Sequence, residues 1–291
     1  MASTIVLKRR IVSIRNTRQI TKAMQLVSAS KLKRAQEYAA KSRDYHDLAV
    51  EMIGRLSQMP DVEKQPLYSK RNIKSRLYIV VSSNTGLAGA FNANIFKILN
   101  NDLKENRDNG IKSSVIAIGN KGAQYVRRLR DVDLIAVYPI AEDYPDANDV
   151  RPILNSVIDG FKDGEFDEIL VLKTLFKSSI SQIAQSVTLL PATLDIPDKP
   201  QVKPITNFEP DIESVIDQVT IRLVEAQLFQ AILESRASEH AMRMMAMKNA
   251  TDNAKDLIDD YTLELNTVRQ SSITQELAEI SGGVEALAQN S

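Results

Sequence analysis

Two glycine turns are the first candidates for chemistry, because a glycine-rich turn between a strand and a helix can hold a phosphate group. They lie at residues 86–89 (GLAG) and 119–122 (GNKG), each after an apolar run typical of a strand. Neither has the spacing or the Lys-Ser/Thr end of a P-loop, and neither is G-x-G-x-x-G. We therefore interpret both as ordinary strand-to-helix turns rather than as nucleotide sites.

Histidines, cysteines and paired carboxylates give no stronger candidate. There is no cysteine, which excludes disulfides, thiolate metal sites and a cysteine nucleophile. His46 and His240 are too distant in sequence for a local metal motif, and we interpret them as a surface residue and an interior residue. Adjacent carboxylates do not face each other on a helix, and the chain has two such pairs, Asp167/Glu168 and Asp259/Asp260. We expect no catalytic residue, no metal and no cofactor.

Two further clusters allow two interpretations each. The basic residues at 31–34 could form a nucleic-acid arm, but Tyr38 is the only aromatic residue nearby and an acidic segment of the same chain is available, so we favour a protein-facing stripe. A group of methionines could be core packing or an adaptable contact surface, and we place core packing slightly ahead for Met242, Met244, Met245 and Met247.

Composition excludes several classes of protein. The 291 residues contain 37 basic and 37 acidic side chains and 43% hydrophobic residues, enough for a core and one or two domains. No apolar run approaches the ~18 residues of a membrane span. The basic N-terminus lacks the apolar region of a secretory signal, so we expect the chain to work in the cytoplasm.

Two segments without glycine or proline predict very long helices. They are residues 1–53 and 211–281, which as helices would be ~80 Å and ~105 Å long. Asp211 is a candidate N-cap, and Gly282-Gly283 is a candidate stop. Stepping by 3 and 4 residues along the second segment, 13 of 17 positions are apolar, which is a heptad seam: Ile216, Val219, Leu223, Ala226, Gln230, Leu233, Ala237, His240, Met244, Met247, Thr251, Ala254, Ile258, Tyr261, Leu265, Val268 and Ser272.

Charge suggests that these two helices pair with each other. Residues 1–45 carry 11 basic and 2 acidic residues, whereas residues 211–291 carry 6 basic and 14 acidic residues. Opposite blocks in one chain favour an antiparallel coiled coil, in which flanking charges select the partner. A weaker apolar seam on the first helix would face the second: Leu7, Ile11, Ile14, Leu32, Ala35, Ala39, Ala49, Ile53 and Leu56.

The middle of the chain alternates strand and helix patterns. Strands are predicted at 77–82, 114–118, 132–137, 168–175 and 182–189, with helices at 92–107, 123–129 and 150–161. This predicts a Rossmann-like α/β domain with a mostly parallel sheet and a final hairpin. We expect three domains: an N-terminal coiled-coil helix at 1–58, a globular domain at 76–205 and a C-terminal coiled-coil helix at 211–287.

The second long helix should extend beyond the first. The predicted lengths leave an overhang of ~27 Å at its C-terminal end. An apolar helix end exposed to water is unfavourable, so something outside the chain should surround its apolar residues: Ile273, Leu277, Ile280, Val284 and Leu287.

Four motifs in order resemble the gamma subunit of F-type ATP synthases over nearly the whole chain. They are residues 20–36 (ITKAMQLVSASKLKRAQ), 86–92 (GLAGAFN), 238–253 (SEHAMRMMAMKNATDN) and 269–280 (RQSSITQELAEI). The resemblance implies the non-catalytic central shaft of a rotary motor, in which the coiled coil lies inside a ring of three alpha and three beta subunits. It implies that the α/β domain is a foot on the epsilon subunit and the membrane c-ring, at the cytoplasmic face of a bacterial membrane.

The resemblance also implies roles for particular residues. Rotor–stator contacts would be made by Met24, Arg243, Gln270, Thr274 and Glu276. Phe208 and Glu209 would meet epsilon and the c-ring, and the tip from Ile273 onward would sit in an apolar sleeve. The family's usual Ser-Asp-Arg-Gly reads Ser83-Asn-Thr-Gly86 here, so an ion pair made there is missing. Ser281-Gly-Gly283 replaces a more apolar end, which could loosen the tip.

Two other functions stay open on the sequence alone. The chain could be an α/β enzyme that dimerises through a coiled-coil stalk, in which case the long helices would pair between molecules. It could also be a basic-arm nucleic-acid binder, whose affinity would fall steeply with salt.

Overall fold

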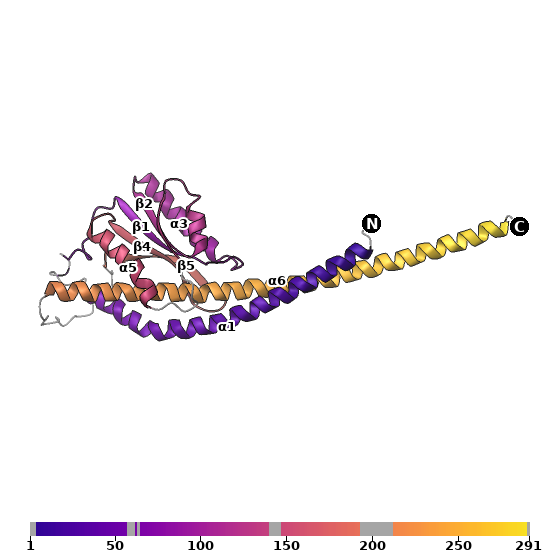
Figure 1. Ribbon diagram of the computed structural model, residues 1–291, viewed down its shortest axis with the longest axis horizontal. Helices are drawn as coiled ribbons and strands as arrows, with labels where there is room; N and C mark the ends of the chain where they lie inside the picture. Colours follow the sequence, from indigo (N-terminus) through magenta and orange to yellow (C-terminus); the bar gives the residue numbers. More distant parts are fainter. Residues whose placement is uncertain (1–3, 57–61, 63–64, 140–146, 193–211, 290–291) are drawn as a thin grey trace. The chain divides into compact units, whose positions relative to one another are not determined.

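The computed structural model describes residues 4–56, 62, 65–139, 147–192 and 212–289, with backbone only at 147, 212–214 and 282–289. It divides into two compact units, one of residues 1–27 and 244–291 and the other of residues 28–243. Both units contain part of two long helices, α1 (Thr4–Leu56) and α6 (Ile212–Gln289). Each unit therefore has its own segment of the helical pair, and all strands in the described part of the chain lie in the larger unit (Figure 1).

The sheet of the larger unit has five strands in the order β3-β2-β1-β4-β5. The first four are parallel, and β5 pairs antiparallel with β4. Their apolar runs suit parallel strands, which are covered on both faces. The strands are β1 (Ser75–Val81), β2 (Lys112–Ile118), β3 (Asp133–Tyr138), β4 (Glu168–Phe176) and β5 (Gln182–Leu190).

Helices cover the two faces of this sheet (Figure 1). On one face α3 (Phe91–Asp108) and α4 (Asn120–Val126) pack over a core that contains Tyr78 and Leu99. On the other face α5 (Ala147–Lys162) packs with the ends of α1 and α6 over a larger core that contains Leu77 and Phe161. The change of face follows the reversal of strand order between β1 and β4, as in doubly wound folds. The predicted fold class, a Rossmann-like α/β domain with paired long helices, is confirmed.

The long helices run antiparallel within each unit. In the larger unit Ser42 of α1 hydrogen-bonds Gln230 of α6. In the smaller unit Thr251 Oγ1 donates to Thr21 Oγ1 at 2.8 Å, and Arg10 lies over the ring of Tyr261 at 5.8 Å from its centroid. Lower residue numbers on α1 thus face higher numbers on α6. The helices pair within one chain, as the opposite charge blocks predict.

The predicted heptad seam is also confirmed. Its positions on α6 are buried or half-buried from Ile216 to Val268, and only Ser272 is exposed. The seam of α1 is buried except at Ile14, which is half-buried. The polar seam residues Gln230, His240 and Thr251 are buried with it, so the repeat rather than apolar character alone identified the contact face.

Two details of the prediction are wrong. The helix predicted at 123–129 is α4 at Asn120–Val126, because residues 82–84 accept hydrogen bonds from the backbone N–H groups of residues 120–122 and fix an earlier start. Gly282-Gly283 does not stop α6, which continues to Gln289. Glycine lowers helix stability by only ~1 kcal/mol per residue, so two glycines do not end a helix by themselves. Asp211, the predicted N-cap, lies outside the described residues.

Candidate functional sites along the helical pair

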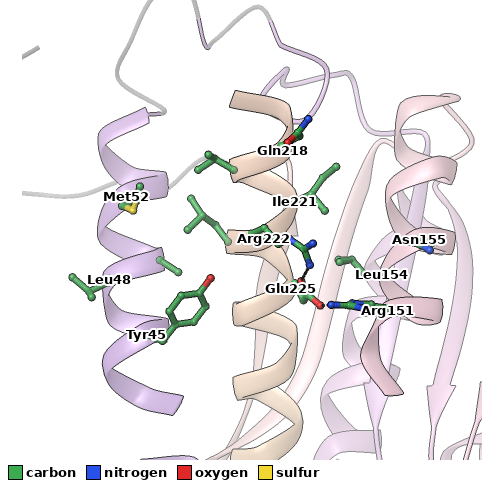
Figure 2. A pocket seen from close by; sticks show the side chains of 13 residues that line it. Tyr45, Leu48, Met52, Arg151, Leu154, Asn155, Gln218, Ile221, Arg222 and Glu225 are labelled. Atoms are coloured by element: carbon green, nitrogen blue, oxygen red, sulfur yellow. Dashed lines mark hydrogen bonds and ion pairs between the residues drawn. The ribbon is translucent and has the colours of Figure 1, made fainter. Parts of the chain in front are cut away.

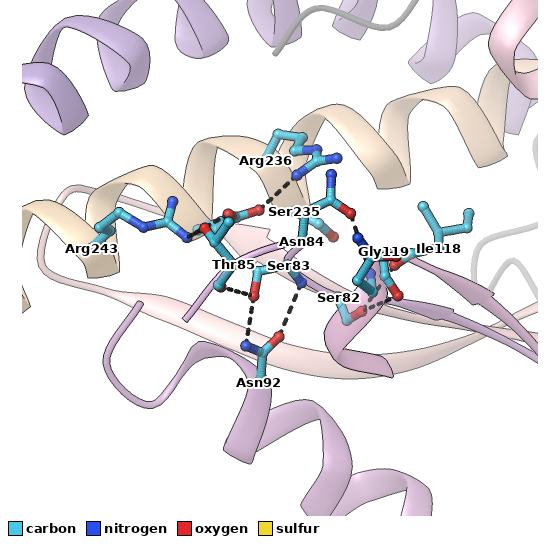
Figure 3. Close-up of polar contacts among 12 residues, drawn as sticks. Ser82, Ser83, Asn84, Thr85, Asn92, Ile118, Gly119, Ser235, Arg236 and Arg243 are labelled. Carbon is cyan, nitrogen blue, oxygen red and sulfur yellow. Dashed lines mark hydrogen bonds and ion pairs between the residues drawn. The ribbon is translucent and has the colours of Figure 1, made fainter. Parts of the chain in front are cut away.

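The first glycine turn is held by its own chain. The Ser83 amide donates to Asn92 Oδ1 at 3.0 Å, and Asn92 Nδ2 donates to Ser83 Oγ at 2.7 Å. The Ser83 hydroxyl in turn donates to the carbonyl of Thr85 at 2.7 Å (Figure 3). Leu87 has a φ of 62°, a conformation that costs a non-glycine residue ~1–2 kcal/mol. The polar groups that hold this turn bond to one another, which supports the interpretation as a structural turn.

The second turn uses glycine for close packing. A Cβ on Gly119 would lie 2.2 Å from the carbonyl oxygen of Ser82, and one on Gly122 would lie 2.7 Å from Ser82 Oγ. The N–H of Gly122 donates to Ser82 Oγ at 2.8 Å, and that of Lys121 donates to the Ser83 carbonyl at 3.0 Å. The N–H groups at the start of α4, which could hold a phosphate, are thus bonded to residues 82–84, which follow β1.

A buried cluster of charges joins α6 to the first turn. Glu239 accepts from Arg236 at 2.9 Å and from Arg243 at 2.7 Å, and all three residues are buried. Arg243 also donates to Thr85 Oγ1 at 3.3 Å and to the carbonyl of Gly86 at 3.5 Å (Figure 3). The residue predicted to contact the stator therefore directs one nitrogen of its guanidinium group, Nη2, at partners inside its own unit.

One turn earlier on α6, a second set of polar contacts reaches β4. Lys173 of β4 pairs with Glu234 at 2.9 Å, and both residues are buried. The amide of Thr174 donates to Ser235 Oγ at 3.0 Å, and Ser238 Oγ donates to the Thr174 carbonyl at 3.2 Å. Together with the charge cluster, these contacts fix both the rotation and the axial position of α6 on the sheet. We call the residues of both sets the polar junction.

Sequence reasoning missed the polar junction, except for Arg243. The spacing of Arg236, Glu239 and Arg243 is a signal that could have been used, since charges three and four residues apart lie on one helix face. Nothing in the local sequence identifies Lys173 as the partner of Glu234, because the two lie 61 residues apart.

The remaining polar candidates have structural roles. Asp167 Oδ2 accepts from the amides of Lys74 and Ser75 at 2.8 and 3.0 Å, and Glu168 pairs with Arg76 at 2.6 Å. His46 is half-buried beside Asp47 rather than fully exposed. Among the described residues no group of His, Asp and Glu is arranged to hold a metal ion.

In the smaller unit, α1 exposes basic residues and no acidic ones. Residues 4–27 contain no Asp or Glu, and the helix exposes its basic residues Lys8, Arg9, Arg10, Arg15, Arg18 and Lys22. Val12 and Ile20 are exposed between them, and Ile5 and Leu26 are exposed on either side. Met24 is half-buried at the edge of this surface. Exposed basic and apolar residues with no carboxylate among them suit contact with an acidic protein surface.

The end of α6 is exposed on every side within this unit. Each residue from Arg269 to Ser281 is exposed, which includes Gln270, Thr274 and Glu276 of the predicted contact set. Ile273, Leu277 and Ile280 are 50%, 62% and 64% exposed. The side chains of Val284 and Leu287 are not described, and Phe208 and Glu209 lie outside the described residues. The predicted contact set thus divides between a buried Arg243, a half-buried Met24 and an exposed tip.

No helix in the described part of the chain is long and apolar enough to cross a bilayer.

Comparison with known proteins identifies relatives along the full chain. Residues 3–287 match the family model described as ATP synthase. The ATP synthase gamma chain of Geotalea uraniireducens is 39% identical over 287 residues, covering 99% of both chains. That of Roseiflexus castenholzii is 39% identical over 292 residues, covering 99% of this chain and 100% of its own.

Solved structures share the fold at lower identity. A chain of the Euglena gracilis mitochondrial ATP synthase (OSCP/F1/c-ring) aligns with a TM-score of 0.67 and 16% identity, over 98% of this chain and 94% of that chain. A chain of the Tetrahymena thermophila mitochondrial ATP synthase (central stalk/c-ring) aligns with a TM-score of 0.61 and 23% identity, over 79% of this chain and 99% of that chain.

Proposed function

The chain belongs to the gamma-chain family of the ATP synthases, and from that premise we propose that it is the central shaft that couples ion-driven rotation of a membrane ring to ATP synthesis and hydrolysis at the beta subunits. The observation that carries the proposal is the gamma-chain match along 99% of both chains. The exposed apolar tip of α6 supports it, because such a surface requires a surrounding partner.

In this proposal the subunit itself is not catalytic. Both glycine turns bond to their own chain, and their glycines serve a strained turn and a close helix–strand contact. The purified chain should neither hydrolyse ATP nor bind it tightly. Stoichiometric nucleotide binding near Gly86 would contradict this.

The proposed partners follow the two regions of the shaft. Three alpha and three beta subunits surround the helical pair, with contacts at Met24, Arg243, Gln270, Thr274 and Glu276. An apolar sleeve holds the tip residues Ile273, Leu277, Ile280, Val284 and Leu287. The epsilon subunit and the c-ring hold the foot, with Phe208 and Glu209 among the contacts. We propose no nucleic-acid partner, and we place the chain as a peripheral subunit at the cytoplasmic face of a bacterial membrane.

The mechanism requires a shaft whose faces differ. Three identical beta subunits take different states only if each meets a face with a different contact energy. Moving a two-state equilibrium from 1:99 to 99:1 takes ~5.5 kcal/mol of differential interaction. Residues 4–27 of α1, which are basic and contain no acidic residue, differ in this way from the acidic, longer α6. Since several moderate contacts share the effect, single substitutions should weaken coupling without abolishing it.

The test is reconstitution with the alpha and beta subunits of the same source. We expect one copy of the chain to assemble with three of each and to support steady ATP hydrolysis. Gln270→Ala, Thr274→Ala and Glu276→Ala should each lower the ratio of ion transport to hydrolysis in the complete enzyme. The control is Lys255→Ala, an exposed position nearer the middle of α6. Failure of the chain to assemble with alpha and beta would overturn the proposal.

A further inference from the structure

The larger unit carries an open groove that the proposed shaft contacts leave unused. It has a volume of about 800 Å³ and lies across the N-terminal part of α6, between the C-terminal part of α1 and the start of α5 (Figure 2). All of its lining residues belong to the larger unit. We propose that this groove binds an amphipathic helix of a partner protein, with carboxylates on that helix facing Arg151 and Arg222.

The apolar wall on α1 has the spacing of a helix-packing surface. Tyr45, Leu48 and Met52 line the groove at intervals of three and four residues and are 58%, 58% and 41% exposed. They adjoin Ala49, which also lines the groove but is buried and belongs, with Ile53, to the core beneath it. Exposed apolar residues at heptad spacing are the usual partner of another helix.

The length of the groove agrees with a helical occupant. The lining residues on α1 run from Tyr45 to Met52 and those on α6 from Gln218 to Glu225, about two turns or ~11 Å on each helix. The groove is open to solvent along its length, as a docking surface for a helix must be. An extended peptide would leave its backbone groups unpaired against these helices, whereas a helix satisfies its own.

Charge selects the kind of helix. Glu225 lies between two arginines and accepts from Arg222 at 2.8 Å and from Arg151 Nε at 3.4 Å (Figure 2). These three are the charged residues of the lining, so its net charge is +1. Arg222 and Arg151 are 60% and 51% exposed at their side chains, whereas Glu225 is 11% exposed. An approaching helix therefore meets guanidinium groups, which favour carboxylates. A second copy of the same face would meet like charge, so we propose a different protein.

The experiment uses the purified, assembled ATP synthase with a benzophenone amino acid in place of Leu48. We expect a photo-adduct between this position and a helix of another subunit that carries carboxylates, identified by mass spectrometry. The matched control replaces Ile180, which is 84% exposed in the same unit and is not among the lining residues. Adducts confined to this chain, to lipid, or to a segment that is not helical or lacks carboxylates would overturn the proposal.

Charge and shape are tested separately. The double variant Arg151→Gln/Arg222→Gln should lower the Leu48 adduct yield at least tenfold, whereas Arg151→Lys/Arg222→Lys should retain most of it. Because the Gln variant leaves Glu225 without its partners, a second variant, Tyr45→Asp, tests the apolar wall without touching that carboxylate. An unchanged yield in both variants would overturn the proposal. Assembly with alpha and beta is measured in the same samples, so failure of the proposed function is distinguishable from failure of the groove.

Discussion

The helix α6 lies in two different environments along its length. From Leu223 to Ala241, within the larger unit, every residue except Gln227 and Phe229 is buried, including charged ones. From Arg269 to Ser281, within the smaller unit, every residue is exposed, including large apolar ones. In the first region charge is buried because partners inside the chain satisfy it. In the second, apolar groups are exposed, and no side chain of the described residues covers them.

This comparison separates two kinds of importance. A residue in the buried region contributes to folding, and its replacement should change the free energy of unfolding of the isolated chain. A residue in the exposed region should leave that free energy unchanged and affect only assembly and coupling. A substitution in the buried region should therefore lower the free energy of unfolding of the isolated chain. An equivalent substitution in the exposed region should leave that free energy unchanged and lower assembly or coupling.

The largest expected effect is that of Glu239→Ala. It leaves Arg236 and Arg243 buried without their shared carboxylate, and loss of one partner of a buried ion pair costs about 3–5 kcal/mol. Urea unfolding of the full chain measures it. Glu276→Ala is the matched control and should change the unfolding free energy by less than about 0.5 kcal/mol. Equal losses in both variants would break the comparison.

An apolar pair repeats the test without charge. Leu233→Ala removes a side chain that is 2% exposed and should cost about 2–5 kcal/mol. Leu277→Ala, at 62% exposure, should cost less than about 0.5 kcal/mol in the isolated chain. In the assembled enzyme we expect the order to reverse, with Leu277→Ala reducing the coupling ratio. A stability loss at Leu277 would mean that the tip packs within its own chain.

The glycines near the end of α6 sharpen the comparison. Because the helix continues through Gly282 and Gly283, replacing either with alanine should stabilise this segment by up to ~1 kcal/mol. Circular dichroism at 222 nm and slower amide hydrogen exchange at residues 282–289 measure the change. If the glycines instead ended the helix, the amides of residues 284–289 in the native chain would exchange at the unprotected rate of a disordered segment.

A smaller effect on stability is expected at Asp102, a half-buried carboxylate on α3. Burial raises the pKa of Asp102, against an opposing effect of Arg76. Because the pKa of Asp102 is raised in the folded state, its contribution to the free energy of unfolding is fully present below the unfolded pKa of about 3.9. That contribution is lost as the pH rises through the folded pKa. Asp102→Asn should therefore gain stability relative to the native chain at pH 7, and the gain should shrink towards pH 4. Urea midpoints at the two pH values measure it, and a gain independent of pH would contradict the assignment.

A tyrosine beside Asp102 has a related shift. Burial raises the pKa of Tyr78 to about 12, although Asn106 Nδ2 donates to its hydroxyl at 2.8 Å. We therefore expect Tyr78 to stay neutral through pH 10, and ultraviolet titration at 295 nm of the native chain should show it ionising after the exposed tyrosines. Tyr78→Phe identifies its contribution to the titration.

The two regions also differ in what could be predicted from the sequence. The seam from Ile216 to Val268 and the exposed tip follow from local periodicity and from the lengths of segments without glycine or proline. The strand and helix order of the α/β domain follows in the same way. These features depend on residues that are close in sequence, and physical reasoning can evaluate them without a structure.

The polar junction could not be predicted from such local patterns. Arg243 meets Thr85 across 158 residues, and Glu234 meets Lys173 across 61 residues. The groove between α1, α5 and α6 likewise depends on three distant segments. The predicted stop at Gly282 failed for a different reason, because propensity weighs against a helix without forbidding it.

The exposed stretch of α6 has a mechanical consequence. Beyond Arg269, no second helix among the described residues of its unit packs against α6. A lone helix is more easily bent and twisted than a packed pair, so this stretch is an elastic element that yields before the paired portion does. We therefore expect bending to concentrate in α6 beyond residue 269, whereas the segment in which α6 packs against residues 4–27 of α1 should stay straight.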